Sequence, residues 1–361
     1  MNITLEAFSP YVKDNTTTIR ILPPQNTRKT MKALVYGGAG IIELKDAPLP
    51  QIIKPTDAVV RVLKTTICGT DLGIIHGKTP SVLPGTTLGH EGVGLVEEIG
   101  SAITKFKKGD RVIISCITAD GTCEYCKKQM FSHCENGGWI LGHTINGTQA
   151  EYVRIPHADN SLYAVPEGLD EESLVMLSDI LPTGYEIGVL YGCVKPGDTI
   201  AIVGAGPVGM AALLTAQVYS PAEIYIVDVD QNCLDLAKQW DATYTINSGK
   251  EDAIARIMLE TKDGVDVSIE AVGIPDTSQT LEFMAKNVDL QIQKRWISNI
   301  TITTGVVNTS TIPLLLKTIT DGQLQPSKLI THHFRLVDIL EAYKVLGNAS
   351  VEKAMKVIIF P

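Results

Sequence analysis

The sequence lacks any apolar run approaching the roughly 20 residues that a membrane-spanning helix needs. It also lacks an excess of basic residues, since 31 Lys and Arg stand against 40 Asp and Glu, a formal net charge of −9. The phosphates of nucleic acids and anionic lipid surfaces repel a chain of this charge. We therefore expect no nucleic acid and no membrane among its partners.

The seven cysteines are not the even set that a disulfide framework requires. Three of them crowd between positions 123 and 134, which favours metal ligation in a reducing compartment such as the cytoplasm. Residues 1–30 show no clear periodicity, and we interpret them as a poorly ordered N-terminal extension. A mitochondrial transit peptide is the alternative, although the acidic Glu6 and Asp14 are unusual in such a signal.

The sequence has no internal repeat and no low-complexity tract, and its 361 residues suffice for two domains. Between residues 31 and 182 short strand patterns alternate with turn residues, which predicts a compact β-rich domain. We expect its strands at residues 31–36, 41–44, 57–65, 91–99, 111–115 and 151–155.

Residues 183–305 change to an alternation of strands and helices, beginning with a fully apolar strand at 199–203. This pattern predicts parallel βαβ units and a doubly wound nucleotide-binding sheet, so the fold class is α/β. Residues 306–361 form a last part, with helices expected at 312–321 and 337–347 and an apolar strand at 355–360.

A glycine-rich turn follows the strand at 199–203 and opens the helix at 207–219. It has the G-x-G-x-x-G pattern of a dinucleotide site and consists of Gly204, Ala205, Gly206, Pro207, Val208 and Gly209. Its glycines permit a tight turn and a close approach of the backbone to a pyrophosphate at the helix N-terminus. The next strand ends at Asp228, whose carboxylate can accept from ribose hydroxyls and would repel a 2′-phosphate. This favours NAD(H) over NADP(H), the alternative being that Asp228 caps the following helix.

Cys68, His90 and Asp179 are the residue types that hold zinc while leaving one coordination position open. Their sequence neighbours carry a resemblance to a known family. The stretches at 67–71, 89–94 and 108–112, together with the glycine-rich turn, resemble the zinc-dependent medium-chain alcohol dehydrogenases. The resemblance implies a GroES-like catalytic domain at 31–182, completed by 306–361, and a Rossmann domain at 183–305.

The resemblance also implies roles for individual residues. Cys68, His90 and Asp179 would be the ligands of a catalytic zinc, with Glu91 as a neighbouring or transient ligand. Thr70 would receive the substrate proton, and relatives often continue this relay with a histidine where this chain has Gly73. His76 is one alternative for that step, and ribose hydroxyls with water are another. The cofactor would contact Thr183, Val272 and Gly273 besides the glycine-rich turn and Asp228.

A second metal site is predicted by the Cys-x2-Cys-x7-Cys spacing of Cys123, Cys126 and Cys134. In the family it resembles, the fourth ligand of this structural zinc stands where the chain has Asp120. A carboxylate oxygen can complete a tetrahedral zinc site, so we expect a Cys3Asp centre, the alternative being an empty site with free thiols. Trp139 either lines the substrate pocket, as its position in the family suggests, or is ordinary buried packing.

The chain departs from the family after Ala285, where roughly a dozen residues, about a turn and a strand, are missing before Lys286. If the deletion is real, the sheet lacks an internal strand, or residues 288–292 take its place. The expected activity is hydride transfer between NAD(H) and a small alcohol, aldehyde or ketone in a homodimer or homotetramer. The alternatives are a zinc-binding member that has lost turnover, or a dehydrogenase of polyols or formaldehyde adducts.

Overall fold

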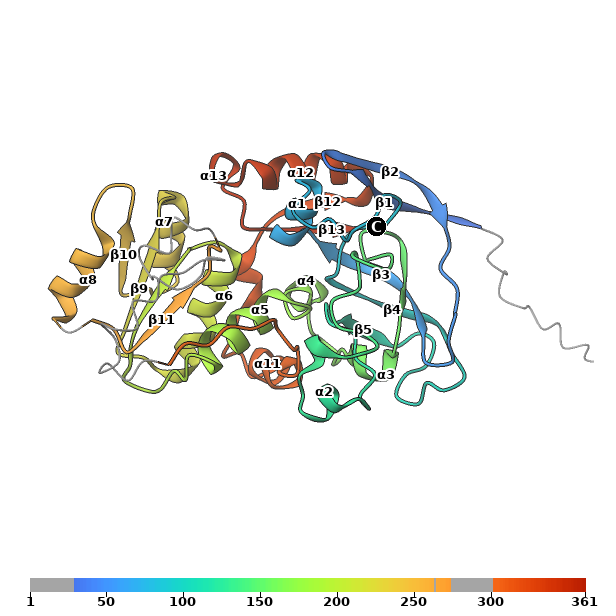
Figure 1. Ribbon diagram of the computed structural model, residues 1–361, viewed down its shortest axis with the longest axis horizontal. Coiled ribbons are helices and arrows are strands. Elements are labelled where there is room, and N and C mark those ends of the chain that lie inside the picture. The colour runs from blue at the N-terminus through green and yellow to red at the C-terminus, as the bar shows by residue number, and fades with distance from the viewer. Residues whose placement is uncertain (1–28, 263, 274–300) are drawn as a thin grey trace, which may run out of the picture.

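The computed structural model describes residues 29–262, 264–273 and 301–361 (Figure 1). A β-rich half and a smaller half built on a parallel sheet lie side by side, and the last part of the chain returns to the β-rich half. The described strands are β1 (Thr30–Gly38), β2 (Ile41–Pro48), β3 (Ala58–Thr66), β4 (Gly92–Ile99), β5 (Arg111–Ile114), β6 (Tyr152–Ile155), β7 (Leu162–Ala164), β8 (Thr199–Val203), β9 (Glu223–Asp228), β10 (Tyr244–Asn247), β11 (Val267–Glu270), β12 (Ile330–Arg335) and β13 (Lys356–Phe360).

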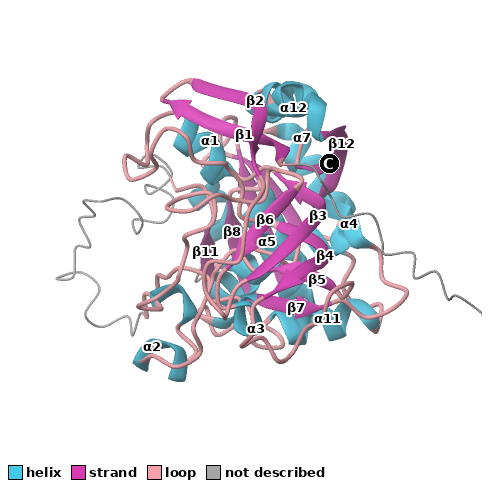
Figure 2. Ribbon diagram, turned by 90° about the vertical axis from the view of Figure 1, so that its right-hand side faces the viewer, coloured by secondary structure: helices cyan, strands magenta, loops and turns pink. Residues whose placement is uncertain are grey.

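The β-rich half contains a seven-stranded sheet in the order β12-β13-β3-β4-β5-β7, with β6 paired to β3. Strands β1 and β2 form a separate antiparallel hairpin. β13 pairs with β3 although almost 300 residues separate them, so the C-terminal segment completes this sheet. Figure 2 shows this sheet with the hairpin above it and α2 at the periphery.

The described part of the second half holds four parallel strands in the order β10-β9-β8-β11. The first strand, β8, lies in the middle, with its two successors on one side and the fourth strand on the other. This is the start of the doubly wound order in which nucleotides bind at the carboxyl ends of the strands. The predicted α/β fold class is therefore confirmed, whereas the gap after Ala285 lies outside the described residues.

The described helical segments range from single turns to the ten residues of α6. They are α1 (Gly69–Ile75), α2 (Glu124–Lys127), η1 (Phe131–His133), α3 (Ala158–Ser161), α4 (Glu171–Val175), α5 (Ile180–Thr183), η2 (Gly184–Leu190), α6 (Pro207–Ala216), η3 (Gln217–Tyr219), α7 (Gln231–Gln239), α8 (Ala253–Thr261), α11 (Ile312–Thr320), η5 (Pro326–Leu329), η6 (Leu336–Asp338), α12 (Ile339–Gly347) and α13 (Ala349–Glu352). Apart from η2, which is π-helical, the η segments are 3-10 helices.

One apolar core runs through both halves. It joins Val93 and Ile113 of the β-rich sheet to residues of α4 and α5, and continues to α6 and β8. Packing is tight at Gly184, where a β-carbon would lie only 2.6 Å from the backbone nitrogen of Ala212. The two halves therefore share buried apolar contacts, which stabilise their association.

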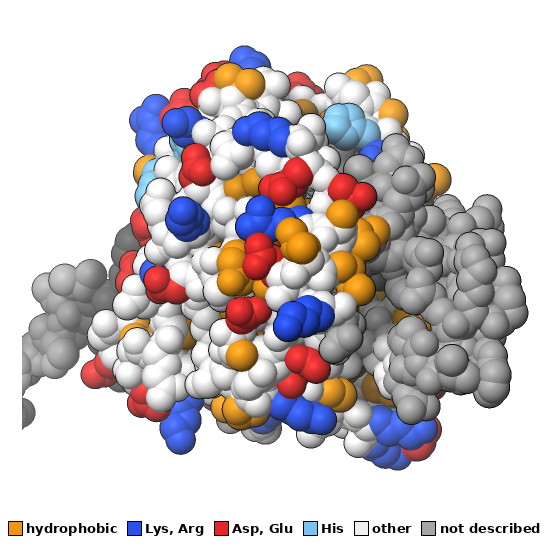
Figure 3. Space-filling model, turned by 90° about the vertical axis from the view of Figure 1, so that its left-hand side faces the viewer, with side chains coloured by type: hydrophobic (Ala, Val, Ile, Leu, Met, Phe, Trp, Pro, Cys, Tyr) orange, Lys and Arg blue, Asp and Glu red, His pale blue; other side chains and the backbone are white. Residues whose placement is uncertain are grey.

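At the outer end of the parallel half, Figure 3 shows acidic and basic side chains interspersed over the described surface, with apolar side chains between them. Exposed apolar residues of α8 include Ile254, Met258 and Leu259. Within the described ranges, no helix combines the length and apolar character needed to cross a bilayer.

Candidate functional site

Three chain segments bring the predicted zinc ligands together. Cys68 follows β3 and occupies the N-cap position of α1. His90 and Glu91 directly precede β4, and Asp179 precedes α5. One potential ligand atom from each of these four residues lies within 4.8 Å of the other three. The structure thus assembles the predicted set from residues up to 111 positions apart (179 − 68).

The imidazole of His90 is oriented with one nitrogen toward the acidic ligands. Its Nε2 lies 3.2 Å from Oδ2 of Asp179 and 3.8 Å from Oε1 of Glu91. The opposite nitrogen, Nδ1, lies 3.8 Å from Oδ1 of Asp71. Nε2 is therefore the atom that could bind a metal, while Nδ1 faces a supporting carboxylate.

Asp71 gives a test of whether zinc fits this site. Its Oδ1 atom is buried and has no hydrogen-bond partner among the described residues. A proton on Nδ1 of His90 would point toward this oxygen, and that tautomer leaves Nε2 free for a metal. With a thiol, an imidazole and carboxylates as donors, the site fits zinc.

The buried charges also favour a cation. Burial alone would lower the pKa of His90, but Asp179, Cys68 and Asp71 raise it well above its usual value. Burial alone would raise the pKa of Asp179, but the hydrogen bond and charge of His90 lower it. Both shifts mean that a positive charge is stabilised between these groups.

Glu91 is paired with the buried Lys356, for which the sequence predicted no role. Nζ of Lys356 lies 2.9 Å from both carboxylate oxygens and 3.3 Å from the carbonyl oxygen of Ile67. Both side chains are almost completely buried, and the charge of Glu91 raises the pKa of Lys356 against the effect of burial. Glu91 is thereby held beside His90 by a residue of β13.

Two threonine hydroxyls lie beside the ligands. The hydroxyl of Thr70, the predicted proton acceptor, is 3.7 Å from the sulfur of Cys68. Thr183 was predicted to contact the cofactor, and its hydroxyl donates a 2.5 Å hydrogen bond to Oδ1 of Asp179. Thr183 therefore also orients Asp179.

A cavity of about 1060 Å³ opens at this cluster and extends into the parallel half. Its walls include Cys68, Thr70, His90, Asp179, Thr183, Val208, Glu270 and a segment at 301–307. Trp139 also lines it, with its ring centroid 6.3 Å from that of His90, and the indole packs against apolar core residues as well. Both alternatives for Trp139 thus describe part of its surroundings. His76 is exposed and is not among the described residues that line the cavity.

The glycine-rich turn has the predicted conformation. Gly204 has φ +100°, and a β-carbon on Gly209 would collide with the carbonyl oxygen of Gly204. A β-carbon on Gly206 would meet no described atom within 4 Å, so the backbone is open there. Gly206 precedes Pro207 at the start of α6, where N–H groups and the helix dipole favour a phosphate. This open helix start fits a dinucleotide.

Asp228 ends β9 next to the turn. Its Oδ2 accepts a 2.6 Å hydrogen bond from the backbone nitrogen of Ala205, and its Oδ1 accepts one from Asp230. The helix α7 is capped by Asp230 and not by Asp228, which contradicts the alternative considered from the sequence. Val272 lies against Gly204, where an added β-carbon would be 2.7 Å from its methyl group. Gly273 has φ +72°, and its nitrogen donates to Glu270.

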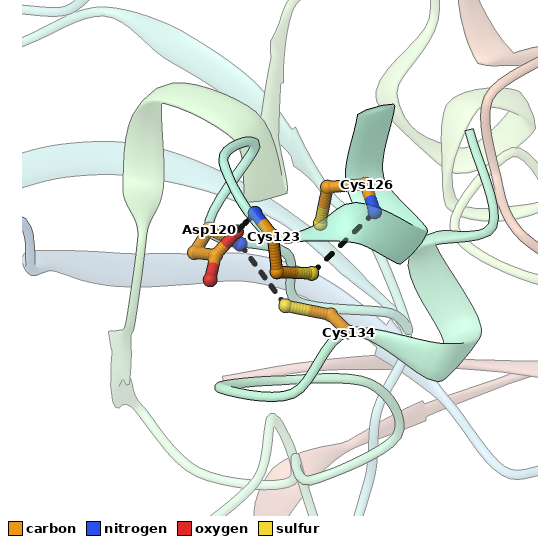
Figure 4. Close-up of side chains that lie close together, drawn as sticks. All are labelled: Asp120, Cys123, Cys126 and Cys134. Atoms are coloured by element: carbon orange, nitrogen blue, oxygen red, sulfur yellow. Dashed lines mark hydrogen bonds between the residues drawn. The ribbon is translucent and has the colours of Figure 1, made fainter. Parts of the chain in front are cut away.

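The second predicted cluster lies in a loop around α2 (Figure 4). Ligand atoms of Asp120, Cys123, Cys126 and Cys134 lie within 4.8 Å of one another. Backbone N–H groups donate to two of the sulfurs, from Asp120 to Cys134 at 3.3 Å and from Cys126 to Cys123 at 3.5 Å. At Cys123 the backbone hydrogen bond from Cys126 lowers the pKa of the thiol, which suits a metal ligand.

Asp120 itself is already hydrogen-bonded. Its Oδ1 accepts from the backbone nitrogens of Thr122 and Cys123, at 2.7 and 3.0 Å, and its Oδ2 accepts from the amide of Asn136 at 2.6 Å. A carboxylate offers about four lone-pair positions, so one remains for a metal. The donor set therefore fits zinc at both clusters.

The cavity wall also includes Cys116, which lies outside the Cys-x2-Cys-x7-Cys spacing of the loop. Its thiol is buried, and burial raises its pKa well above the usual value, with the nearby carboxylates of Asp179 and Glu91 adding to the shift. No spacing signal could have indicated this position, because Cys116 reaches the cavity only through the fold. The same holds for Lys356, which lies in a strand predicted simply as apolar.

Two family models match the sequence. Residues 54–167 match the alcohol dehydrogenase GroES-like domain, and residues 207–290 match the zinc-binding dehydrogenase model.

Full-length similarity extends over nearly the whole chain. The chain is 34% identical to an alcohol dehydrogenase of Cupriavidus necator, over 92% of this chain and 99% of that protein. Among solved structures, zinc-dependent alcohol dehydrogenase 2 from Streptococcus pneumonia, in its apo form, is 51% identical with a TM-score of 0.86. That match covers 91% of this chain and 98% of the other. An alcohol dehydrogenase from Thermus sp. ATN1 is 33% identical with a TM-score of 0.85, covering 91% and 99%.

Proposed function

Because the chain belongs to the family of zinc-dependent alcohol dehydrogenases, we propose that it transfers hydride between NAD(H) and a small alcohol, aldehyde or ketone. One observation carries this proposal. The ligand atoms of Cys68, His90, Glu91 and Asp179 lie within 4.8 Å of one another, and three of these residues line a cavity that reaches Val208 of the glycine-rich turn.

Cys68, His90 and Asp179 would hold the catalytic zinc, with Glu91 close by. Bound zinc supplies a Lewis acid that lowers the pKa of an alcohol hydroxyl and polarises a carbonyl. Thr183 holds Asp179 through its hydroxyl, and Lys356 holds Glu91 beside the ligands. Asp120, Cys123, Cys126 and Cys134 would hold a second, structural zinc.

Thr70 would receive the proton of the substrate hydroxyl, because its own hydroxyl lies next to Cys68 at the cavity wall. Gly73 has no side chain to carry the proton further. Since His76 is exposed and outside the described cavity lining, we favour ribose hydroxyls and water as the remaining path.

For the cofactor we propose NAD(H), bound by the open start of α6 and by Val272, Gly273 and Thr183. Asp228 lies beside Ala205 of the turn, where its negative charge would repel a 2′-phosphate. Changing Asp228 to Gly should therefore raise the ratio of kcat/KM with NADP to that with NAD. An unchanged ratio would contradict the assignment of cofactor preference.

The function is tested by three measurements on the purified chain. Zinc per chain after desalting should be two, and a value of one would leave the Asp120 site empty. Titration with NADH should give saturable fluorescence enhancement. Absence of binding would favour the alternative of a zinc-binding relative without turnover, and a panel of simple alcohols, polyols and formaldehyde adducts, followed by NADH absorbance, would separate the remaining activities.

We further propose that residues 31–182 together with 306–361 act as the catalytic domain and that residues 183–305 act as the coenzyme domain. In this proposal the protein is a cytoplasmic homodimer or homotetramer. The separate sheets of the two halves and the pairing of β13 with β3 support the domain division, and the seven free cysteines suit a reducing compartment.

A further inference from the structure

Asp71, the carboxylate behind His90, is held from a second direction. It is 1% exposed, and its Oδ2 accepts from the backbone nitrogen of Cys68 at 2.9 Å. The same oxygen accepts a 3.1 Å hydrogen bond from Nε2 of Gln149. Asp71 therefore depends on a side chain from the loop before β6 for part of its orientation.

Gln149 is fully buried, and every polar atom of its amide can be accounted for. Nε2 donates to Asp71 and to the carbonyl oxygen of Thr66, each at 3.1 Å. Oε1 accepts a 2.8 Å hydrogen bond from the hydroxyl of Tyr343. The reversed amide would place its oxygen against a carboxylate and a carbonyl, so the amide has one favourable orientation.

Gln149 also packs against the residue before His90. Gly89 has φ +92°, and a β-carbon on it would lie 2.6 Å from Cγ of Gln149 and 2.8 Å from its backbone nitrogen. This close approach restricts the backbone next to His90, while Oδ1 of Asp71 lies 3.8 Å from Nδ1 of the ring.

Tyr343 supplies the last link, from α12. Its side chain is 6% exposed and packs with Ile67 and Ile74, on either side of the Cys68 turn. Burial raises the pKa of its phenol well above the usual value, so the hydroxyl remains a donor. A continuous series of polar contacts then runs from α12 to the ring of His90.

We propose that Gln149 and Tyr343 are positioning residues of the metal centre, acting through Asp71 to fix the tautomer and orientation of His90. This inference rests on the proposed catalytic zinc. Partners behind a metal-bound histidine change metal affinity by about 10–100-fold, and these two residues extend that support to the C-terminal segment.

The test is the rate of zinc release to the chromogenic chelator 4-(2-pyridylazo)resorcinol. The phase that belongs to the catalytic site is the one that Asp179→Ala lacks. Gln149→Leu should accelerate this phase about 10–100-fold, and Tyr343→Phe should accelerate it several-fold. The control is Tyr225→Phe, which removes the hydroxyl of another buried tyrosine, one that donates to Glu223 on β9. It should leave the phase unchanged.

A double variant decides whether the effect passes through Asp71. In an Asp71→Asn background, Tyr343→Phe should add no further acceleration. Equal acceleration in both backgrounds, or none with either variant, would overturn the inference. If Gln149→Leu does not fold, the test uses Tyr343→Phe alone, provided that its melting temperature in excess zinc is unchanged.

Identical release by the unsubstituted protein and Asp179→Ala would refute the proposed zinc ligands themselves, and the positioning role with them.

Discussion

The two candidate metal clusters are built in opposite ways. Asp120, Cys123, Cys126 and Cys134 come from one loop of 15 residues, partly open to solvent. The cluster of Cys68, His90, Glu91 and Asp179 comes from three distant segments and is supported by residues of β13 and α12. The loop cluster depends mainly on local backbone geometry, whereas the other depends on the assembled fold.

The two clusters also differ in the groups that stabilise their negative charges. In the loop, backbone N–H groups donate to Asp120 and to two sulfurs, and solvent is near. In the buried cluster, Glu91 has Lys356 as its partner, and Asp71 leaves one oxygen without a partner among the described residues. The buried cluster should therefore respond more strongly to the loss of a single side chain.

The largest effect is expected from Asp179→Ala. Removing this ligand should lower the zinc affinity of the buried site by more than about 100-fold, beyond the range for supporting residues, and should abolish turnover. Zinc per chain by metal analysis should fall by one, while Asp120→Ala should lower only the loop zinc and retain turnover. Undiminished zinc in Asp179→Ala would contradict the ligand assignment.

Next in size is the loss of the buried ion pair. Lys356→Met leaves the carboxylate of Glu91 buried without its partner and should lower the free energy of unfolding by about 3–5 kcal/mol. The double variant Glu91→Leu/Lys356→Met should recover most of this loss. The exposed pair of Lys127 and Glu124 in the loop gives the comparison, since Lys127→Ala should cost less than about 1 kcal/mol. Equal losses in urea denaturation would show that burial does not distinguish the two clusters.

Both clusters could be predicted, but for different reasons. The Cys-x2-Cys-x7-Cys spacing is a local property, and so is the strand, glycine turn and helix around Gly204. The meeting of Cys68, His90 and Asp179 came from the family resemblance alone, because no periodicity relates segments so far apart.

Supporting residues were missed because their partners are distant in sequence. Lys356 lies in a strand with an apolar sequence, and no residue near it in the sequence indicates that it pairs with Glu91. Strand β12 was also missed, since its polar residues, including His332 and His333, conceal its half-buried alternation. The π-helical segment η2 was missed because apolar periodicity does not distinguish it from an α-helix.

A smaller effect is expected from Asp120→Cys. A fourth thiolate is a stronger zinc donor than a carboxylate, so zinc release from the loop to a chelator should slow, on the order of tenfold. Release from the buried site should not change, because the variant touches none of its ligands. Faster release from the loop would instead indicate that the hydrogen bonds of Asp120 to Thr122, Cys123 and Asn136 matter more than ligand strength.

The smallest effect concerns the dependence of stability on pH in zinc-stripped protein. Burial alone would raise the pKa of Asp120, but hydrogen bonds from Asn136 and from the backbone of Thr122 and Cys123 hold it well below its usual range. Since the folded pKa is depressed, this stabilisation is complete above the unfolded value of about 3.9 and is lost as pH falls below it.

In Asp120→Asn the side chain does not titrate, so its stability should decline less between pH 5 and pH 3 than that of the unsubstituted protein. Urea midpoints at both pH values give the difference between the two proteins, in which the other acidic groups cancel. That difference should shrink at pH 3. A constant difference would mean that the hydrogen bonds to Asp120 do not favour its charged form, and the loop would then lack the prepared anionic ligand on which its comparison with the buried cluster depends.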